Sequence, residues 1–281
     1  MPFRLDQFYN TLPAIAHSGV SVSPNRAGLN LQVYEALDST NRAAWEHLAT
    51  NSVAEVVVIA EQQWAGRGQW GRQWQSHPGG LYLSWGFRPA LRADHATQIT
   101  LWSAWGVAIA LRQAGVPVQI KWLNDLVVLG RKLGGVLTET RVQQGHIGQA
   151  VVGVGLNWTN PVPKPGINLH MLKQQGYVLK IASLEELGAI ALQGLRLGYA
   201  FWQQRGIEAL QAEYEALLSN CGQTITLVGD AEAPGETVVI IGIGLDGQLR
   251  VRTNQTSNFS ERLLPPGSIR LGYPTGTCSE G

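Results

Sequence analysis

Apolar positions along the chain repeat at spacings that distinguish strands from helices. Residues 56–60 are wholly apolar and mostly β-branched, which is typical of a strand buried on both faces. Residues 96–114 place Ile99, Trp102 and Gly106 at helical spacing and predict an amphipathic helix. Other short apolar or alternating runs predict strands at 31–36, 81–87, 118–122, 125–128, 135–139 and 151–156.

Polar residues mark the beginnings of two more helices. The cluster at 38–41 consists of helix-capping residues and precedes a helix predicted over 42–50. Ser183 and Glu186 form a capping box that opens a later helix. Helical spacing continues from there to Asn220, and Gly222 provides a stop signal.

The pattern changes again after residue 220. Short strands are predicted at 224–228, 237–243, 248–253 and 269–271, with a hairpin turn at Asp246 and Gly247. They indicate a small barrel over 221–273, which follows a mixed α+β region over 31–220 and precedes a tail at 274–281. Prolines and glycines are scattered through residues 1–30, which predicts an extended lead-in with little helix.

Composition narrows the class of protein. Of 281 residues, 44% are hydrophobic and 15% charged, so the chain can bury a sizeable core. The net charge of +1 gives no global basic field for nucleic acid. The apolar stretch 99–111 is too short to span a membrane, no signal peptide is expected, and Cys221 and Cys278 make no disulfide framework. We therefore expect a cytoplasmic location.

A glycine-rich segment at 66–72 carries the strongest chemical signal. Its three glycines allow positive φ and close approach to a ligand, and successive N–H groups there can bind an anion. Residues 62–93 contain four arginines and no acidic residue, which fits a small phosphate-bearing ligand; a surface loop with solvated arginines is the alternative. The glycine spacing also matches a dinucleotide fingerprint, but residues 74–80 cannot form the helix that this fingerprint requires.

Two lysines flank a turn farther along the chain. Lys121 lies on a predicted strand, a turn holds Asn124 and Asp125, and Lys132 precedes a pair of glycines. Lysines placed there would offset charge that grows on an α-phosphate when a carboxylate attacks it, and Asp125 would orient a lysine or approach Mg²⁺. The alternative is an ordinary turn with solvated lysines.

The strand at 151–156 is rich in small residues. Its glycines would let a flat ring approach closely, and the amide of Asn157 suits an adenine edge. Ordinary dense packing is the alternative interpretation of the same residues.

Taken together and in this order, the motifs resemble the biotin–protein ligase (biotin–[acetyl-CoA-carboxylase] ligase) family over roughly residues 31–272. The resemblance implies an α+β domain with a mixed sheet and packed helices, like the class II synthetases, followed by a small SH3-like β-barrel. It fits the monofunctional type without a DNA-binding domain, so no nucleic acid is expected. The motifs are Ser39-Thr40-Asn41, the segment 66–74, Lys121-Trp122-Leu123-Asn124-Asp125, Lys132-Leu133-Gly134-Gly135-Val136-Leu137 and Gly153-Val154-Gly155-Leu156-Asn157.

The resemblance also implies an activity. Biotin and ATP would give biotinyl-5′-AMP and pyrophosphate, and a lysine of a biotin carboxyl carrier protein of acetyl-CoA carboxylase would then take the biotinyl group. ATP and Mg²⁺ would be co-substrates, with no tightly bound prosthetic group. No membrane partner is expected, and a homodimer is left open.

The same resemblance assigns roles to residues. Lys132 and Arg67 are the expected catalytic residues, and the metal ligands are not assigned. Where the family usually has two arginines this chain has Gln69 and Trp70, so the loop that closes the site has two fewer charges. The expected biotin contacts are Ser39, Thr40, Asn41, Gln63, Arg67, Gly68, Gln69 and Lys132, and the expected ATP or adenylate contacts are Arg67, Trp70, Arg72, Lys121, Asn124, Asp125, Gly155 and Asn157.

Three other functions remain to be distinguished. A lipoate–protein ligase would share the fold, although Gln63 and the glycine-rich loop favour biotin. A nicotinamide-dependent oxidoreductase would need a helix directly after Gly71. A non-catalytic biotin-binding protein would bind biotin and release no pyrophosphate.

Overall fold

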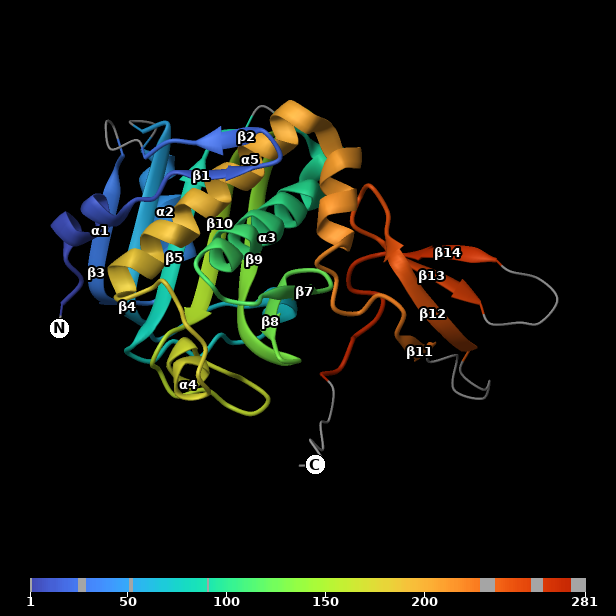
Figure 1. The fold of residues 1–281 in the computed structure, drawn as a ribbon. Coiled ribbons are helices and arrows are strands. Elements are labelled where there is room, and N and C mark those ends of the chain that lie inside the picture. Colours follow the sequence, from blue (N-terminus) through green and yellow to red (C-terminus); the bar gives the residue numbers. More distant parts are fainter. Residues whose placement is uncertain are drawn as a thin grey trace.

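The main body of the protein is built on a mixed β-sheet. A computed structural model describes residues 2–24, 29–50, 53–89, 91–227, 236–253 and 260–273. The first two strands of the sheet run parallel, and the other neighbours described are antiparallel. Across the sheet (Figure 1) the order is β3 (Leu31–Leu37), β4 (Glu55–Gln63), β5 (Gly80–Phe87), β10 (His146–Asn157), β9 (Arg131–Gln143), β8 (Asp125–Val128) and β7 (Gln119–Lys121), and β6 (Leu91–Arg92) pairs with the start of β10.

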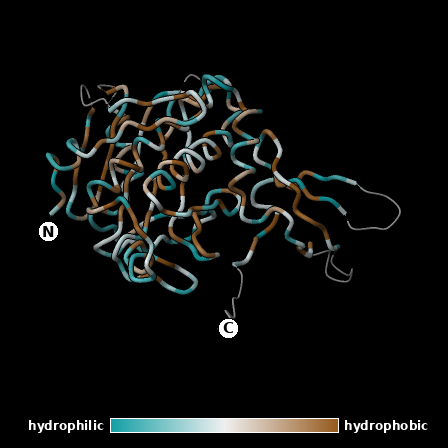
Figure 2. Tube along the Cα trace, viewed as in Figure 1, coloured by the Kyte–Doolittle hydropathy of each residue, from teal (hydrophilic) through white to brown (hydrophobic). Residues whose placement is uncertain are grey.

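Helices cover both faces of this sheet. One face packs against α2 (Thr40–Ala49), and the other packs against α3 (Ala96–Gln113) and α5 (Leu184–Glu215). Strand β4 alternates between the two cores, because Val57 and Ile59 join the larger core while Val56 and Val58 join the core under α2. The prediction of a strand buried on both faces is therefore confirmed. Figure 2 shows hydrophobic segments gathered in the main body, where sheet and helices meet.

Most predicted elements lie where the hydrophobic pattern put them, with β9 and β10 longer than expected. The capping box is confirmed, since the Ser183 hydroxyl accepts a hydrogen bond from the Glu186 N–H at 3.2 Å. The helix it opens ends at Glu215, five residues before the predicted end, and breaks at Gly206, where φ is +81°. The remaining short elements are η1 (Gln69–Gly71), η2 (Ala93–His95) and α4 (Leu169–Gln174).

Within the expected lead-in, the prediction of little helix is wrong for residues 5–11. They form α1 (Leu5–Thr11), and a hairpin of β1 (Ile15–His17) and β2 (Val20–Val22) follows. Phe8 is fully buried in the larger core, and Glu61 and Glu185 accept hydrogen bonds from the backbone of residues 3 and 4. Tertiary packing stabilises a helix too short to form alone, which the local pattern could not reveal.

After α5 the chain forms a small antiparallel sheet at one end of the main body (Figure 1). The predicted hairpin turn is present, with Gly247 at φ +74°. The strand predicted at 269–271 is wrong: these residues are not in a strand, and Ile269 and Leu271 pack against the main core instead. The predicted tail at 274–281, with Cys278, lies outside the described residues. The sheet consists of β11 (Thr224–Leu227), β12 (Glu236–Ile243), β13 (Leu249–Thr253) and β14 (Glu261–Leu264) in that order.

Candidate active site

A cavity of about 270 Å³ opens where the ends of several strands meet the glycine-rich loop. It is lined by the start of α2, the end of β4, the loop, the β7–β8 turn, the middle of β9 and β10, and residues 266–271 after the small sheet. Fourteen of the fifteen residues expected to bind ligand line this one cavity, and the exception is Asn157. Those fourteen are Ser39, Thr40, Asn41, Gln63, Arg67, Gly68, Gln69, Trp70, Arg72, Lys121, Asn124, Asp125, Lys132 and Gly155.

One corner of the cavity is made of hydroxyl and amide groups. The Gln63 Oε1 accepts hydrogen bonds from the Thr40 N–H at 2.8 Å and from its hydroxyl at 3.1 Å. The Gln63 Nε2 donates to the Ser76 hydroxyl at 2.8 Å. Ser39 stands at the N-cap of α2, yet its hydroxyl makes no capping bond. This corner therefore offers donors and acceptors to a small polar ligand without a net charge.

The glycine-rich loop closes as a small hairpin. The Trp74 N–H donates to the Gly66 carbonyl at 2.9 Å, and the Gly68 N–H donates to the Arg72 carbonyl at 2.8 Å. Trp70 and Gly71 both have positive φ at the tip. No α-helix follows Gly71 in this described segment, which runs through the loop into β5. This geometry excludes the dinucleotide-binding arrangement.

Arg67 ties the loop to the sheet through a residue that the motifs did not identify. Its Nη2 lies 2.5 Å from Glu139 Oε1, and the other oxygen of Glu139 accepts a hydrogen bond from Asn41 Nδ2 at 2.8 Å. The Ser84 hydroxyl continues the network, 2.6 Å from Asn41 Oδ1 and 2.8 Å from Thr40 Oγ1. A continuous polar network therefore joins the loop to the hydroxyl–amide corner. The only sequence signal for Glu139 was an acidic residue two positions after the motif at 132–137.

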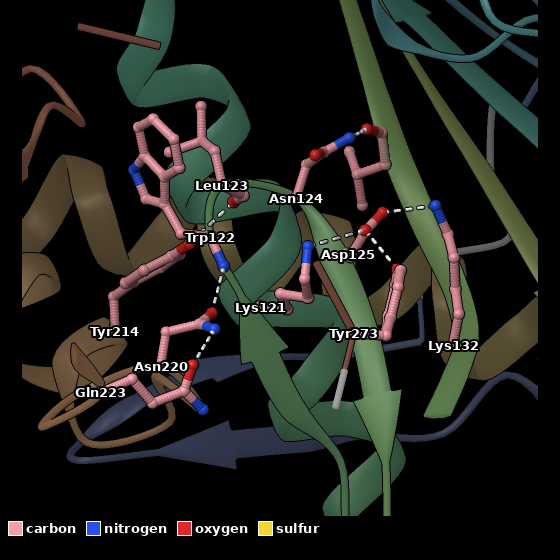
Figure 3. Close-up of polar contacts among 11 residues, drawn as sticks. Lys121, Trp122, Leu123, Asn124, Asp125, Lys132, Tyr214, Asn220, Gln223 and Tyr273 are labelled. Carbon is pink, nitrogen blue, oxygen red and sulfur yellow. Dashed lines mark hydrogen bonds and ion pairs between the residues drawn. The ribbon is translucent and has the colours of Figure 1, made fainter. Parts of the chain in front are cut away.

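Two lysines converge on one carboxylate on the opposite wall (Figure 3). Lys132 Nζ lies 2.5 Å from Asp125 Oδ1, and Lys121 Nζ lies 3.9 Å from Asp125 Oδ2. The Asn124 Nδ2 donates to the Val136 carbonyl, which holds the turn against β9. The two lysines that flank the turn therefore meet at one carboxylate, whereas their phosphate-binding role remains a prediction.

The β7–β8 turn is held from outside the sheet. The Trp122 N–H donates to Asn220 Oδ1 at 3.2 Å, and its indole donates to the Gly247 carbonyl at 2.9 Å. The Tyr214 hydroxyl donates to the Leu123 carbonyl at 2.7 Å (Figure 3). The end of α5 and the small sheet therefore both fix the position of Lys121 and Asp125.

The charge of the cavity is strongly positive. Five lining residues are cationic and one, Asp125, is acidic; the cationic ones are Arg67, Arg72, Lys121, Lys132 and Arg270. Burial lowers the pKa of Lys121, and the charges of Lys132 and Arg72 lower it further against the attraction of Asp125. Such a site gains stabilising interactions when an anion enters.

The four arginines of the acid-free stretch divide into two pairs. Arg67 and Arg72 reach the cavity, and none of the described carboxylates forms an ion pair with Arg72. Arg88 instead donates to the Leu48 carbonyl, and Arg92 pairs with Asp94. The inference of a ligand-directed cationic segment therefore applies to the first pair alone.

The flat ring that approaches the small residues of β10 belongs to the protein. A Cβ added to Gly155 would lie 2.6 Å from the Trp74 indole nitrogen, so glycine is required for this close contact. Lys132 Nζ lies 5.2 Å from the centre of the same ring. Trp74 thus forms a wall of the cavity, packed against β10 and facing Lys132.

Asn157 is buried outside the cavity. Its Nδ2 donates to the Ile167 carbonyl at 3.2 Å, and its Oδ1 accepts from Asn160 at 3.0 Å. Its amide is occupied by bonds that fix the chain after β10. A direct contact with adenine therefore remains a prediction that this geometry does not support.

Sequence reasoning missed the segment after the small sheet. A Cβ added to Gly267 would lie 2.5 Å from the Trp70 ring, so the tip of the glycine-rich loop rests on this segment. No motif marks these residues, and their place in the site depends on a long-range contact. Those that line the cavity are Pro266, Gly267, Ile269, Arg270 and Leu271.

The described part of the chain lacks two features that would point to other classes of function. No group of three or more His, Cys, Asp or Glu side chains there is arranged to hold a metal ion. No helix among the same residues has the length and apolarity needed to cross a membrane.

Comparison with known proteins gives consistent relatives. A model of the biotin/lipoate A/B protein ligase family matches residues 33–157. The chain is 30% identical over 238 residues to the biotin–[acetyl-CoA-carboxylase] ligase of Mycobacterium tuberculosis. This alignment covers 79% of this chain and 82% of the relative. The chain is 31% identical over 227 residues to the bifunctional ligase/repressor BirA of Escherichia coli, in an alignment that covers 79% of this chain and 68% of the relative.

Another relative is matched over a smaller part of its length, and a solved structure has a similar fold. The match to BirA of Bacillus subtilis is 33% identical over 132 residues and spans 41% of that relative's length. The biotin protein ligase from Aquifex aeolicus in complex with biotin and ATP superposes with a TM-score of 0.63 at 23% identity, over 83% of this chain and 99% of that chain. At this identity the superposition establishes a shared α+β fold.

Proposed function

Because this chain belongs to the biotin protein ligase family, we propose that it is an ATP-dependent ligase that activates biotin as biotinyl-5′-AMP and transfers it to a carrier-protein lysine. The observation that carries the proposal is one cavity that joins an uncharged hydroxyl–amide corner to a pair of lysines. The first part suits a neutral polar head group, and the second suits phosphates.

The corner around Thr40 and Gln63 matches the head group of biotin. The ureido ring has two N–H donors and one carbonyl acceptor, and hydroxyl and amide groups can satisfy all three. In this arrangement Ser39, Thr40, Asn41 and Gln63 read the ring. The valeryl carboxylate would then extend toward Lys132 along the wall made by Trp74.

The first step joins biotin to the nucleotide. A carboxylate oxygen of biotin attacks the α-phosphorus of ATP, a new P–O bond forms, and the bond to the bridging oxygen breaks to release pyrophosphate. Negative charge grows on the α-phosphate oxygens, and Lys132, Lys121 and Arg72 would offset it without having to reorganise. Arg67, with the loop of Gly68, Gln69 and Trp70, would cover the adenylate and exclude water that would hydrolyse it.

The second step moves the biotinyl group to protein. The neutral ε-amine of a carrier lysine attacks the acyl carbon, an amide bond forms, the bond from that carbon to the phosphate oxygen breaks to release AMP, and the nitrogen loses one proton to water. The partner we propose is therefore a biotin carboxyl carrier protein of acetyl-CoA carboxylase. The chain needs no nucleophile of its own for this reaction, because placement and charge account for the catalysis.

Mg²⁺ would enter with ATP as part of the substrate. Among the described lining residues Asp125 is the single carboxylate, with the Asn124 amide beside it. Both oxygens of Asp125 are already engaged by Lys132, Lys121 and Tyr273, so we expect the phosphates of ATP and water to hold Mg²⁺. When bound, the ion would neutralise charge on the phosphates.

Finer features of the prediction are part of the same proposal. We infer that residues 31–220 act as the catalytic domain and 221–273 as an SH3-like barrel domain, supported by the antiparallel order of β11 to β14. A cytoplasmic location is also proposed. The proposal includes both a monomer and a homodimer.

The decisive experiment measures pyrophosphate release from ATP and Mg²⁺ with biotin, with lipoate and with neither. Release with biotin alone, followed by biotinylation of a carrier domain, is the expected result. Release with lipoate would favour the lipoate ligase, and biotin binding without any release would indicate a non-catalytic binding protein. A rise in melting temperature with NAD would revive the oxidoreductase alternative.

A further inference from the structure

The chain returns to the cavity after the small sheet, in a segment that we call the C-terminal segment (residues 265–273). Five of its residues line the cavity, and its Gly267 supports the ring of Trp70 at the tip of the glycine-rich loop. The last described residue, Tyr273, reaches the far wall. Its hydroxyl donates a hydrogen bond to Asp125 Oδ2 (Figure 3).

Tyr273 also contacts one of the two lysines. Lys121 Nζ lies 4.5 Å from the centre of the Tyr273 ring, within the range of a cation–π interaction. The Asp125 side chain therefore has a distinct partner on each oxygen: Lys132 on Oδ1, and Tyr273 on Oδ2, with Lys121 close to the latter. The tyrosine completes a cluster in which two ammonium groups share one carboxylate.

The hydroxyl of Tyr273 is well suited to remain a donor. A carboxylate oxygen can only accept a hydrogen bond from this hydroxyl, so the phenol is the donor of the pair. Tyr273 is not among the lining residues although Leu271 is, so the ring lies beside the ligand space and not within it.

A carboxylate shared by two lysines needs a third contact to stay in one orientation. With Oδ2 unbonded, the Asp125 carboxylate could rotate toward Lys121, lengthening the 2.5 Å contact to Lys132. A displacement of about 1 Å at a group that stabilises charge can lower a rate by about 100-fold. The hydrogen bond from Tyr273 opposes this rotation.

We propose that Tyr273 is a positioning residue for the adenylation step, which sets Asp125 and thereby the two lysines at the α-phosphate. The inference rests on the proposed function. It also assigns the C-terminal segment a specific task at the reacting end of the site, through one hydrogen bond and one ring contact. The small sheet then contributes to chemistry in the main body through this residue.

Two variants at this position separate the hydrogen bond from the ring. Tyr273→Phe removes the hydroxyl and keeps the ring under Lys121, whereas Tyr273→Leu removes both. Tyr34→Phe is the matched control, because it removes a hydroxyl that bonds to His47 away from the cavity. Each full-length variant is assayed for biotin affinity, for kcat and KM of pyrophosphate release, and for transfer from added biotinyl-5′-AMP to a carrier domain.

We expect Tyr273→Phe to lower kcat of pyrophosphate release about 10-fold, which corresponds to about 1.4 kcal/mol. Biotin affinity, melting temperature and transfer from added adenylate should stay near wild type. Tyr273→Leu should lower kcat of pyrophosphate release further, and Tyr34→Phe should leave it unchanged.

Three outcomes would overturn the assignment. Tyr273→Phe with wild-type kcat would show that the hydroxyl does no positioning. Equal losses in biotin binding, release and transfer would indicate a structural role only. A wild-type protein that releases no pyrophosphate would overturn the proposed function, and this inference with it.

Discussion

Lys132 is the residue whose removal should separate chemistry from folding most clearly. Its ammonium lies 2.5 Å from Asp125 and faces the ring of Trp74 at 5.2 Å, on the wall where we place the α-phosphate. Removing one preorganised charge-stabilising group typically lowers a rate by about 10²–10³, or roughly 3–4 kcal/mol of transition-state stabilisation. We expect Lys132→Ala to reduce pyrophosphate release by that factor.

Stability should respond far less to the same change. The Lys132 side chain is 28% exposed, so the ion pair is partly screened by solvent. Asp125 also keeps its contacts with Lys121 and Tyr273. The free energy of unfolding should therefore fall by about 1 kcal/mol or less. Urea unfolding of the variant beside the wild type measures this directly.

Rapid-quench measurement of adenylate formation with saturating biotin and ATP is the appropriate assay. Lys132→Arg keeps the charge and should recover part of the rate, while Lys180→Ala removes an exposed lysine outside the cavity and should change nothing. If Lys132→Ala forms adenylate within threefold of the wild-type rate while folded, the role given to this lysine is wrong. If the loss comes with global unfolding, the estimate of the ion pair is wrong instead.

Three other predictions follow from the contacts around the cavity. Glu139→Gln removes the charge that holds Arg67, so hydrogen exchange over residues 64–76 of the ligand-free protein should become faster by up to about fivefold, the most expected for a half-exposed ion pair. The control is Glu46→Gln, which removes an exposed ion pair on α2. Unchanged exchange in Glu139→Gln would refute the idea. Lys121→Met should melt at or above the wild type near neutral pH while losing adenylate formation. The pKa of Lys121 is lowered in the folded protein, so the charged lysine destabilises the fold fully at pH values below that pKa. This destabilisation disappears as the pH rises to the ordinary pKa of lysine. The difference in melting temperature between Lys121→Met and the wild type should therefore shrink over the same pH range. Deleting the chain from residue 221 removes Gly247 and the C-terminal wall of the cavity, so adenylate formation and carrier biotinylation should fall more than biotin binding; complete unfolding on truncation would place the domain boundary elsewhere or make the contact obligatory.

The local pattern of the sequence predicted the elements that bury a continuous apolar face. Strand β4 and helix α3 are examples, because the middle of β4 is apolar at every position and α3 is apolar at helical spacing. The course and the end of α5 were predicted less well. The break in α5 at Gly206 and its end at Glu215 depend on what the helix packs against, and helical spacing alone continued past both.

The order of the motifs predicted more than the apolar pattern did, because it identified the residues expected to bind ligand. Fourteen of the fifteen expected ligand-binding residues line one cavity, since each motif sits on a strand end or loop that the sheet brings to the same place. Asn157 is the exception. Its residue type suited a ligand, but its amide is occupied by bonds to Ile167 and Asn160 that only the folded chain creates.

The sequence by itself therefore determined the mixed α+β class, the elements with strong apolar periods and the residues that carry the proposed chemistry. The tertiary structure alone decided which of them meet: Arg67 with Glu139, Trp74 with Gly155, and Tyr273 with Asp125. The physical reason is that these pairs are separated by 72, 81 and 148 positions along the chain, so no local period or propensity encodes them. They form only when burial of the apolar faces has fixed the sheet, the helices and the C-terminal segment against one another.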